Sequence, residues 1–278
     1  MTATVSPPRR RRVGWTPGRH AALALVAALV AFYLVFPLLV TIPISFNSVR
    51  RVGFPPKGFS LQWYEEFLGI GDPSGSRWLS ATWLSVRIAV ATSVLSTVLG
   101  GLAAIPVARA SFWGKNLIQT LLLLPLVLPV IVLAVGIFLF YVPLGLLGSP
   151  AGIVFGHSVL AIPYVTLIVA ATLKNFDVRL EWAAMSLGAS RARTLWSVTI
   201  PLVRPGILAG ALFAFLTSFD ELLIALFVSG TRAVTLPRLL WDFLRTEASP
   251  VIAVVSTLLT LFSVLAVALI ALVQRERR

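Results

Sequence analysis

The sequence predicts an all-α polytopic membrane protein with six transmembrane helices, and three observations lead to this fold class. Of the 278 residues, 58% are hydrophobic and only 12% are charged, whereas a soluble domain carries about 25% charged residues. Several uncharged stretches exceed the roughly 20 residues that cross a bilayer. The chain has no cysteine, which excludes disulfides, thiolate metal sites and cysteine nucleophiles.

The first expected helix follows a basic tail. Arg9–Arg12 before an apolar run is typical of a signal peptide, whose apolar region spans about 7–15 residues. Here the chain stays uncharged from Ala21 to Val49, so we expect an uncleaved transmembrane helix. The expected segments are a tail over 1–20, a helix over 21–45, a loop over 46–77 and, in that loop, a short surface helix at Gln62–Leu68.

Five more helices are expected in a core domain over 78–273. The segment from Asn116 to Leu173 has no charge and is too long for one span, and a turn from Pro143 to Pro150 divides it. Pro125 and Pro129 are expected to kink the first half. The five spans are expected at about 83–108, 117–141, 151–173, 206–228 and 251–273, with a tail over 274–278.

The lysines and arginines predict the orientation of these helices. Six spans place both termini on one side, which carries fifteen of the 23 basic residues, while the other side carries seven. Cytoplasmic loops are enriched in Lys and Arg, so both termini are expected in the cytoplasm. Because the basic residues flank apolar runs and do not cluster on a folded polar surface, the net charge of +13 does not indicate nucleic-acid binding.

A long cytoplasmic loop is expected over 174–205. Its first part predicts a short amphipathic helix, in which Trp182, Met185 and Ala189 share one face. A second short helix is expected over 191–198, ended by Pro201 and Pro205, with Pro205 opening the fifth span. The pattern alone leaves two interpretations open: a helix on the membrane surface or a helix that docks into a partner's groove.

This loop resembles a known motif. Its residues Glu181-Trp-Ala-Ala-x-x-x-Gly188-Ala, followed by Thr199-Ile-Pro201-Leu-x-x-Pro205-Gly206, are similar to the "EAA" loop of type I, binding-protein-dependent ABC importer permeases. The resemblance implies that the loop forms a coupling helix seated on a cytoplasmic ATPase. It assigns this coupling role to Glu181, Trp182, Ala183, Ala184, Gly188, Ala189, Pro201 and Pro205.

One position departs from the family pattern. Aligning Gly188 and the two alanines places Trp182 where the family has glutamate, with Glu181 one residue earlier. On a helix that shift turns the carboxylate by about 100°. We therefore expect Trp182 to fill an apolar part of the docking groove.

Further motifs are similar to the spermidine/putrescine type of permease. They are Phe54-Pro-Pro-x-Gly-Phe-Ser-Leu-x-Trp-Tyr64, Ser218-Phe-Asp-Glu221, Phe227-Val-Ser-Gly230, and Thr235-Leu-Pro-x-x-x-Trp241 with Leu244-Arg-x-Glu247-x-x-Pro250. The resemblance implies half of a translocation pathway in a bacterial inner membrane, for a polyamine or another small solute. It implies three partners: an ATPase dimer, a second permease subunit in a heterodimer, and a periplasmic or lipid-anchored substrate-binding protein.

The chain lacks the motif with which it could bind and hydrolyse ATP itself. A phosphate-binding loop needs Gly-x-x-x-x-Gly-Lys-Ser/Thr. The lysines are Lys57, Lys115 and Lys174, and none of them stands in this pattern. We therefore expect no catalytic site, no metal and no cofactor in this chain, with ATP used by the partner ATPase.

Charges inside the expected spans mark candidate pathway residues, namely Asp220, Glu221 and Arg87. Buried carboxylates in a membrane are costly and indicate a pathway or a pair. Asp220 lies about 14 residues into the fifth span, roughly 20 Å from its start at 1.5 Å per residue. Three interpretations stay open for it: lining of the pathway, a structural pair with Arg87, or exposure at the outer boundary.

Two other function classes are weaker alternatives. A membrane enzyme would need acids, bases or metal ligands clustered at one membrane face, and no histidine is near Asp220 and Glu221 in sequence. A stand-alone secondary transporter would usually show two related halves, which this sequence does not show. His157, near the edge of the fourth span, is assigned no role.

Overall fold

The computed structural model of the chain describes residues 17–72, 76–247 and 249–276, and within these ranges every regular element is helical. Two units are distinguished: one from residues 1–64 with 248–278, and a central one from residues 65–247. The first unit contains α1 (Pro17–Ile44) and α12 (Val251–Glu276), while α2 (Gln62–Leu68) crosses the boundary. The bounds of α2 match the predicted surface helix.

In the first unit, α1 packs against α12, yet its side chains from Ala21 to Leu39 are exposed. The loop after α1 is closed by hydrogen bonds of its own. The buried Trp63 indole donates to the carbonyl of Asn47 at 2.5 Å, and the Asn47 side chain accepts from the Lys57 amide at 2.9 Å. The exposed apolar surface of α1 suits a helix surrounded by lipid.

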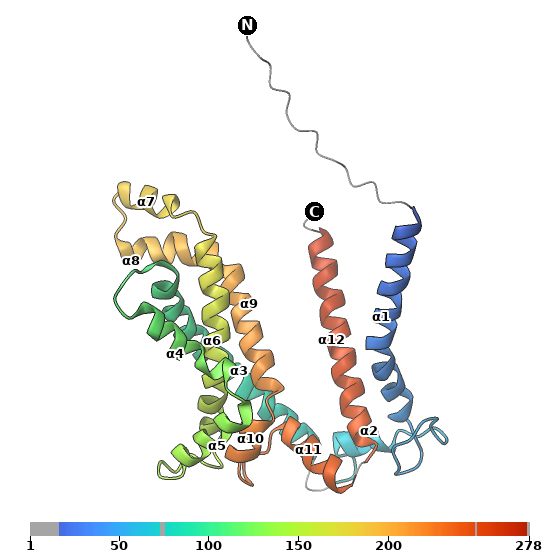
Figure 1. Cartoon of the computed structure of the whole chain (residues 1–278). Coiled ribbons are helices and arrows are strands. Elements are labelled where there is room, and N and C mark those ends of the chain that lie inside the picture. The colour runs from blue at the N-terminus through green and yellow to red at the C-terminus, as the bar shows by residue number, and fades with distance from the viewer. Residues whose placement is uncertain (1–16, 73–75, 248, 277–278) are drawn as a thin grey trace. The chain divides into compact units, whose positions relative to one another are not determined.

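Three long helices form the centre of the second unit: α3 (Arg77–Arg109), α6 (Pro150–Lys174) and α9 (Ile200–Phe219) lie side by side (Figure 1). Small residues on α3 allow the close approach, as is common in membrane bundles. A Cβ added to Gly100 would lie 2.9 Å from the Ile162 carbonyl oxygen of α6. The Ser93 hydroxyl donates across to the Ala211 carbonyl of α9 at 2.6 Å.

The predicted third span bends sharply. Helices α4 (Lys115–Val127) and α5 (Val130–Tyr141) meet at 104°, which confirms the kink expected from the prolines. Leu128, which precedes Pro129, has an extended backbone (φ −71°, ψ 141°), because a following proline disfavours the helical region. Pro129 itself has no N–H to continue the ladder.

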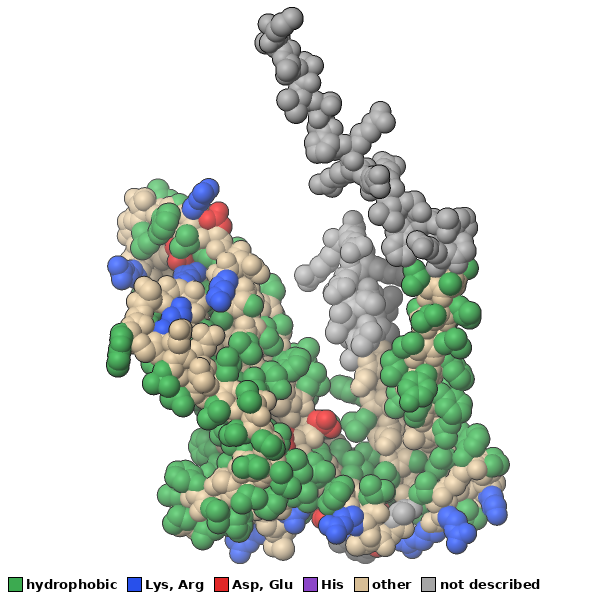
Figure 2. Space-filling view, viewed as in Figure 1, with side chains coloured by type: hydrophobic (Ala, Val, Ile, Leu, Met, Phe, Trp, Pro, Cys, Tyr) green, Lys and Arg blue, Asp and Glu red, His purple; other side chains and the backbone are tan. Residues whose placement is uncertain are grey.

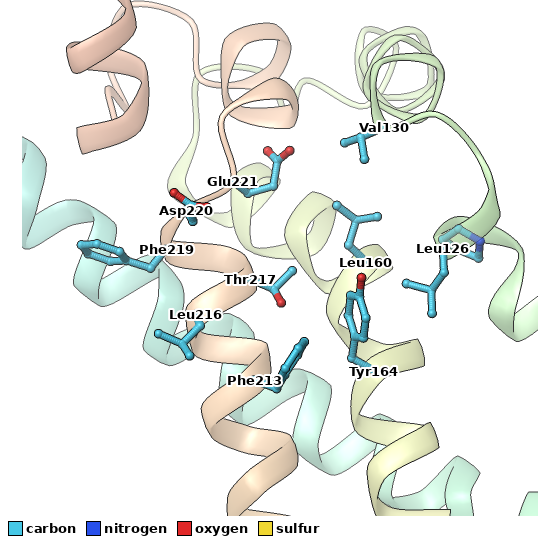
Figure 3. Close-up of a pocket in the computed structure, with 11 residues that line it drawn as sticks. Leu126, Val130, Leu160, Tyr164, Phe213, Leu216, Thr217, Phe219, Asp220 and Glu221 are labelled. Atoms are coloured by element: carbon cyan, nitrogen blue, oxygen red, sulfur yellow. The ribbon is translucent and has the colours of Figure 1, made fainter. Parts of the chain in front are cut away.

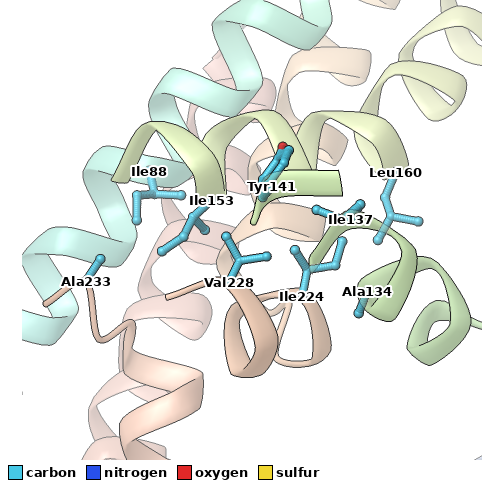
Figure 4. Packing of buried hydrophobic residues seen from close by; sticks show 9 residues of the cluster. All are labelled: Ile88, Ala134, Ile137, Tyr141, Ile153, Leu160, Ile224, Val228 and Ala233. Carbon is cyan, nitrogen blue, oxygen red and sulfur yellow. The ribbon is translucent and has the colours of Figure 1, made fainter. Parts of the chain in front are cut away.

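The expected continuous span over 206–228 is wrong. Helix α9 ends at Phe219 and a separate short helix, α10 (Leu223–Val228), follows after a three-residue break. The Glu221 side chain accepts from the backbone amides of Leu223 and Ile224, and such local capping competes with helix continuation. Figure 4 shows Ile224 and Val228 of α10 packed against Ile137 and other buried residues of α5 and α6.

The expected loop over 174–205 contains α7 (Arg179–Ser186) and α8 (Arg191–Thr194). The prediction that Pro201 and Pro205 end the second helix is wrong, because α8 runs through a π-helical turn (Leu195–Thr199) straight into α9. Pro201 follows the π turn, at the start of α9. Pro205, expected to open the fifth span, lies inside α9 instead.

By length and composition, four helices in the described part of the chain could cross a membrane, or five if the bent pair is one span. The four lie at Ala21–Ile44, Arg77–Arg109, Pro150–Lys174 and Arg191–Phe219, and the apolar part of α12 described with side chains is Val251–Leu265. In the central unit, hydrophobic side chains cover the middle, while Lys and Arg lie at both ends, the one that carries α7 and α8 and the opposite one (Figure 2).

Candidate functional site

A pocket of about 590 Å³ opens where the two helix breaks of the central unit face α6. One wall comes from the last turns of α9 and the residues after it, and another from α6 (Figure 3). The α4–α5 bend contributes the remaining side. The lining residues are Pro125, Leu126, Val130, Leu160, Tyr164, Phe213, Leu216, Thr217, Phe219, Asp220 and Glu221.

Asp220 is the exposed acid of this pocket. It is the C-terminal cap residue of α9, and its amide still donates to the Leu216 carbonyl. Its carboxylate has no hydrogen-bond or ion-pair partner among the residues that the structure describes. A carboxylate held open on an apolar wall is available to a cationic solute.

Glu221 has a different task, although it also borders the pocket. Its side chain is only 8% exposed, and its two oxygens accept from the amides of Leu223 at 3.2 Å and Ile224 at 2.7 Å. This is the geometry of an N-terminal cap on α10. The two adjacent acids thus differ, with Glu221 engaged by backbone amides and Asp220 free within the described residues.

Arg87 lies elsewhere in the central unit. It is exposed on α3, stands 5.9 Å from the Trp83 ring, and lines a separate groove of about 280 Å³ with Pro150 and Val154. Within the described ranges, no ion pair joins it to Asp220 or Glu221. The structural pair that was one of the three interpretations of Asp220 is therefore not formed.

Aromatic side chains on the pocket wall were not predicted. The rings of Tyr164 and Phe213 lie 5.1 Å apart, one on α6 and one on α9, on the same pocket as Asp220. Aromatic faces attract cations. Apolar spans carry many aromatic residues, and sequence periodicity does not reveal which of them face a pocket formed by helix breaks.

The predicted coupling loop lies at one end of the central unit, with α5 and α10 at the other (Figure 1). Helix α7 ends in a Schellman motif: the Gly188 amide donates to Met185 at 3.0 Å and the Ala189 amide to Ala184 at 3.1 Å. Gly188 has φ +89°, and a Cβ there would meet nothing within 4 Å. The glycine is therefore required by backbone conformation and not by crowding.

Glu181 faces the bundle and not the exposed side of α7. Its carboxylate binds Arg109 at the end of α3, at 2.7 and 2.8 Å, and accepts a hydrogen bond from Thr199 in the π turn. Trp182 is 58% exposed and Met185 is also exposed, whereas Ala189 is half-buried. The one-residue shift seen in the sequence thus leaves an exposed apolar face on α7 and ties α7 to α3 and to the π turn before α9.

The other residues of the predicted loop lie as follows. Ala183 is exposed and Ala184 half-buried, on neighbouring faces of α7. Pro201 is half-buried and Pro205 exposed in the first turns of α9. Sequence reasoning missed the contacts of Glu181 with Arg109 and Thr199, because they join positions far apart in the chain.

Comparison with known proteins identifies the family of the chain. Residues 96–278 match the family described as binding-protein-dependent transport system inner membrane component. The chain is 31% identical to the spermidine/putrescine transport system permease protein PotC of Haemophilus influenzae, over 87% of this chain and 90% of that protein. It is 33% identical to the putrescine transport system permease protein PotI of Escherichia coli K12, over 84% of each.

Other relatives carry different cargo. The molybdenum transport system permease protein ModB of Haemophilus influenzae is 34% identical over 62% of this chain and 82% of that protein. A crystal structure of a bacterial ABC transporter that imports the acidic polysaccharide alginate shares the fold, with a TM-score of 0.60, 16% identity and coverage of 94% and 98%. The chain belongs to the family of inner-membrane permease components of binding-protein-dependent ABC importers.

Proposed function

We propose that this importer permease carries a small polycation, a polyamine of the spermidine or putrescine kind, across the bacterial inner membrane. The observation that carries the proposal is the free carboxylate of Asp220 in the pocket beside Tyr164 and Phe213. An acid and aromatic faces suit an ammonium group, and an anionic solute would be repelled by the same acid. The names of the relatives PotC and PotI support the same class of cargo.

The proposed topology has six spans with both termini in the cytoplasm. The bent pair α4–α5 counts as one span and α12 as the sixth. This arrangement places α7 in the cytoplasm, in agreement with the basic residues around it. The pocket at Asp220 then lies towards the opposite side, from which solute arrives.

ATP is hydrolysed by a separate ATPase dimer in this proposal, and the chain itself binds no cofactor. The exposed apolar face of α7, with Trp182 and Met185, is the docking surface for that ATPase. The contacts of Glu181 with Arg109 and Thr199 transmit movement of α7 to α3 and to the helix that continues into α9. A second permease subunit, in a heterodimer, completes the pathway, and a binding protein outside the membrane delivers the solute.

Uptake by cells tests the role of Asp220. A strain lacking this gene is complemented with wild type, Asp220→Asn or Arg87→Gln, and initial uptake of labelled spermidine and putrescine is compared at equal membrane abundance. A charged hydrogen bond contributes about 1.5–3 kcal/mol, so Asp220→Asn should slow uptake roughly ten- to hundredfold, while Arg87→Gln should retain it. Unchanged uptake by Asp220→Asn would remove this acid from the pathway.

A further inference from the structure

One histidine lies beside the break between α9 and α10, bonded to the last turn of α9 and close to Glu221 in the break. His157 lies on α6 and is 1% exposed. Its Nδ1 is 2.8 Å from the hydroxyl of Ser218, in the last turn of α9, and its Nε2 is 3.7 Å from a carboxylate oxygen of Glu221, beyond that turn. Phe219 and Asp220 lie between Ser218 and Glu221 in the chain.

Other contacts hold α10 against the same part of the chain. Next to His157, a Cβ on Gly156 would come within 2.8 Å of the Ile224 side chain, so α10 lies directly on α6 there. At its other end, the Val228 carbonyl accepts from the Gly148 amide at 2.8 Å, and Arg238 donates to the Gly230 carbonyl at 2.5 Å. Helix α10 is thus fixed at both ends, and His157 connects its capping residue to α9.

The Asp220 side chain itself makes no polar contact within the described ranges. Its place in the pocket therefore depends on the backbone of the break. We infer that His157 is a positioning residue, which sets the Asp220 carboxylate in the pocket by holding the Ser218 hydroxyl in the last turn of α9, with its ring packed beside Glu221. The inference rests on the proposed pathway role of Asp220.

A histidine that only fills space would be a poor choice at this position. Its Nε2 has no hydrogen-bond partner in the structure, and buried polar atoms left without partners are costly. An apolar side chain of similar size would fill the volume without that cost. The polar ring is used at Nδ1, which is hydrogen-bonded to the Ser218 hydroxyl, while Nε2 lies 3.7 Å from the Glu221 carboxylate without a hydrogen bond.

The absence of cysteine allows a direct measurement of the break. An Asp220→Cys variant is labelled with a cationic thiol reagent in membranes, with and without His157→Asn, which keeps a polar atom near Nδ1 but does not reach Glu221. The matched control is Ser158→Ala, a buried neighbour whose hydroxyl bonds only to Val154 of its own helix. We expect His157→Asn to change the labelling rate severalfold and Ser158→Ala to leave it unchanged.

A double-mutant cycle on uptake completes the test. If His157 acts through Asp220, His157→Asn should slow uptake in the wild-type chain and have no further effect in the Asp220→Asn chain, because coupled residues are not additive. Ser218→Ala should reproduce the effect from the other side of the contact, which keeps the test informative if His157→Asn fails to reach the membrane.

The outcomes separate the two ideas. Fully additive losses, or an unchanged labelling rate at residue 220 in both His157→Asn and Ser218→Ala, would overturn the positioning role of His157. Unchanged uptake by Asp220→Asn alone would instead overturn the proposed pathway, whatever the labelling shows.

Discussion

At the scale of single residues, two adjacent acids differ in what surrounds them. Glu221 is engaged by two backbone amides, whereas Asp220 is free in the pocket. The sequence marked both carboxylates as candidates for the pathway, because acids inside spans are costly, and left a structural pair or exposure open for Asp220. It did not predict which acid is free, since that depends on where the helix breaks and on which amides are left without partners.

Removing the Glu221 carboxylate tests whether Glu221 stabilises the start of α10 while Asp220 does not. Glu221→Ala leaves the first amides of α10 without their acceptor and should cost about 0.5–2 kcal/mol, the usual range for a lost N-cap. Thermal unfolding of the purified protein in detergent should therefore shift to lower temperature for Glu221→Ala and stay near wild type for Asp220→Ala. A lower unfolding temperature for Asp220→Ala alone would reverse the assignment.

At the scale of elements, the sequence predicted what depends on local chemistry. Helix α2 and the proline bend between α4 and α5 were both expected from nearby residues. The α9–α10 break and the π turn were missed, since apolar periodicity does not register a side-chain cap or a widened turn. Both missed features carry residues of the candidate sites, Asp220 at the break and Thr199 in the turn.

Helix α7 ends at a residue whose backbone adopts the left-handed conformation. Gly188 has φ +89° with open space around it, so a β-branched substitution is strained by about 1–2 kcal/mol through backbone conformation alone. We expect Gly188→Val to reduce co-purification of the ATPase and solute uptake. Gly188→Asn, which tolerates this conformation, should retain both, and equal loss in the two variants would mean that the backbone is not the reason.

Two neighbouring glycines of α3 provide a test of the helix packing. A Cβ on Gly100 meets the backbone of α6 at 2.9 Å, whereas one on Gly101 meets nothing within 4 Å. Gly100→Ala should lower the free energy of unfolding by about 1–3 kcal/mol, as overpacking does. Gly101→Ala should be neutral or slightly stabilising by its helix propensity. Thermal unfolding in detergent compares the two, and equal effects would contradict the packing of α3 on α6.

At the scale of the whole molecule, composition and apolar length were sufficient to predict a membrane protein, and the loop motif its family. The number of spans is harder to predict from the sequence, because the bent pair α4–α5 and the break between α9 and α10 interrupt the apolar helices. Charge counting predicts the direction of the chain. The candidate pocket required the structure, since residues from α4, α5, α6 and α9 meet only after folding.

The proposed orientation can be read by labelling single cysteines in this cysteine-free chain. Leu187→Cys lies beside the docking helix and Leu144→Cys in the loop between α5 and α6, and both positions are exposed. A membrane-impermeant thiol reagent should label Leu144→Cys in intact spheroplasts, and Leu187→Cys only after permeabilisation. The reverse pattern would place the termini outside.

The central claim is that this chain is the membrane subunit through which an ATP-driven importer passes a polyamine. Its most direct test uses proteoliposomes that contain the permease with its second permease subunit and its ATPase, with ATP inside and binding protein with labelled spermidine outside. We predict accumulation that requires internal ATP and the binding protein, and that falls roughly ten- to hundredfold with Asp220→Asn. Absence of accumulation, or accumulation that continues without ATP, would contradict the account.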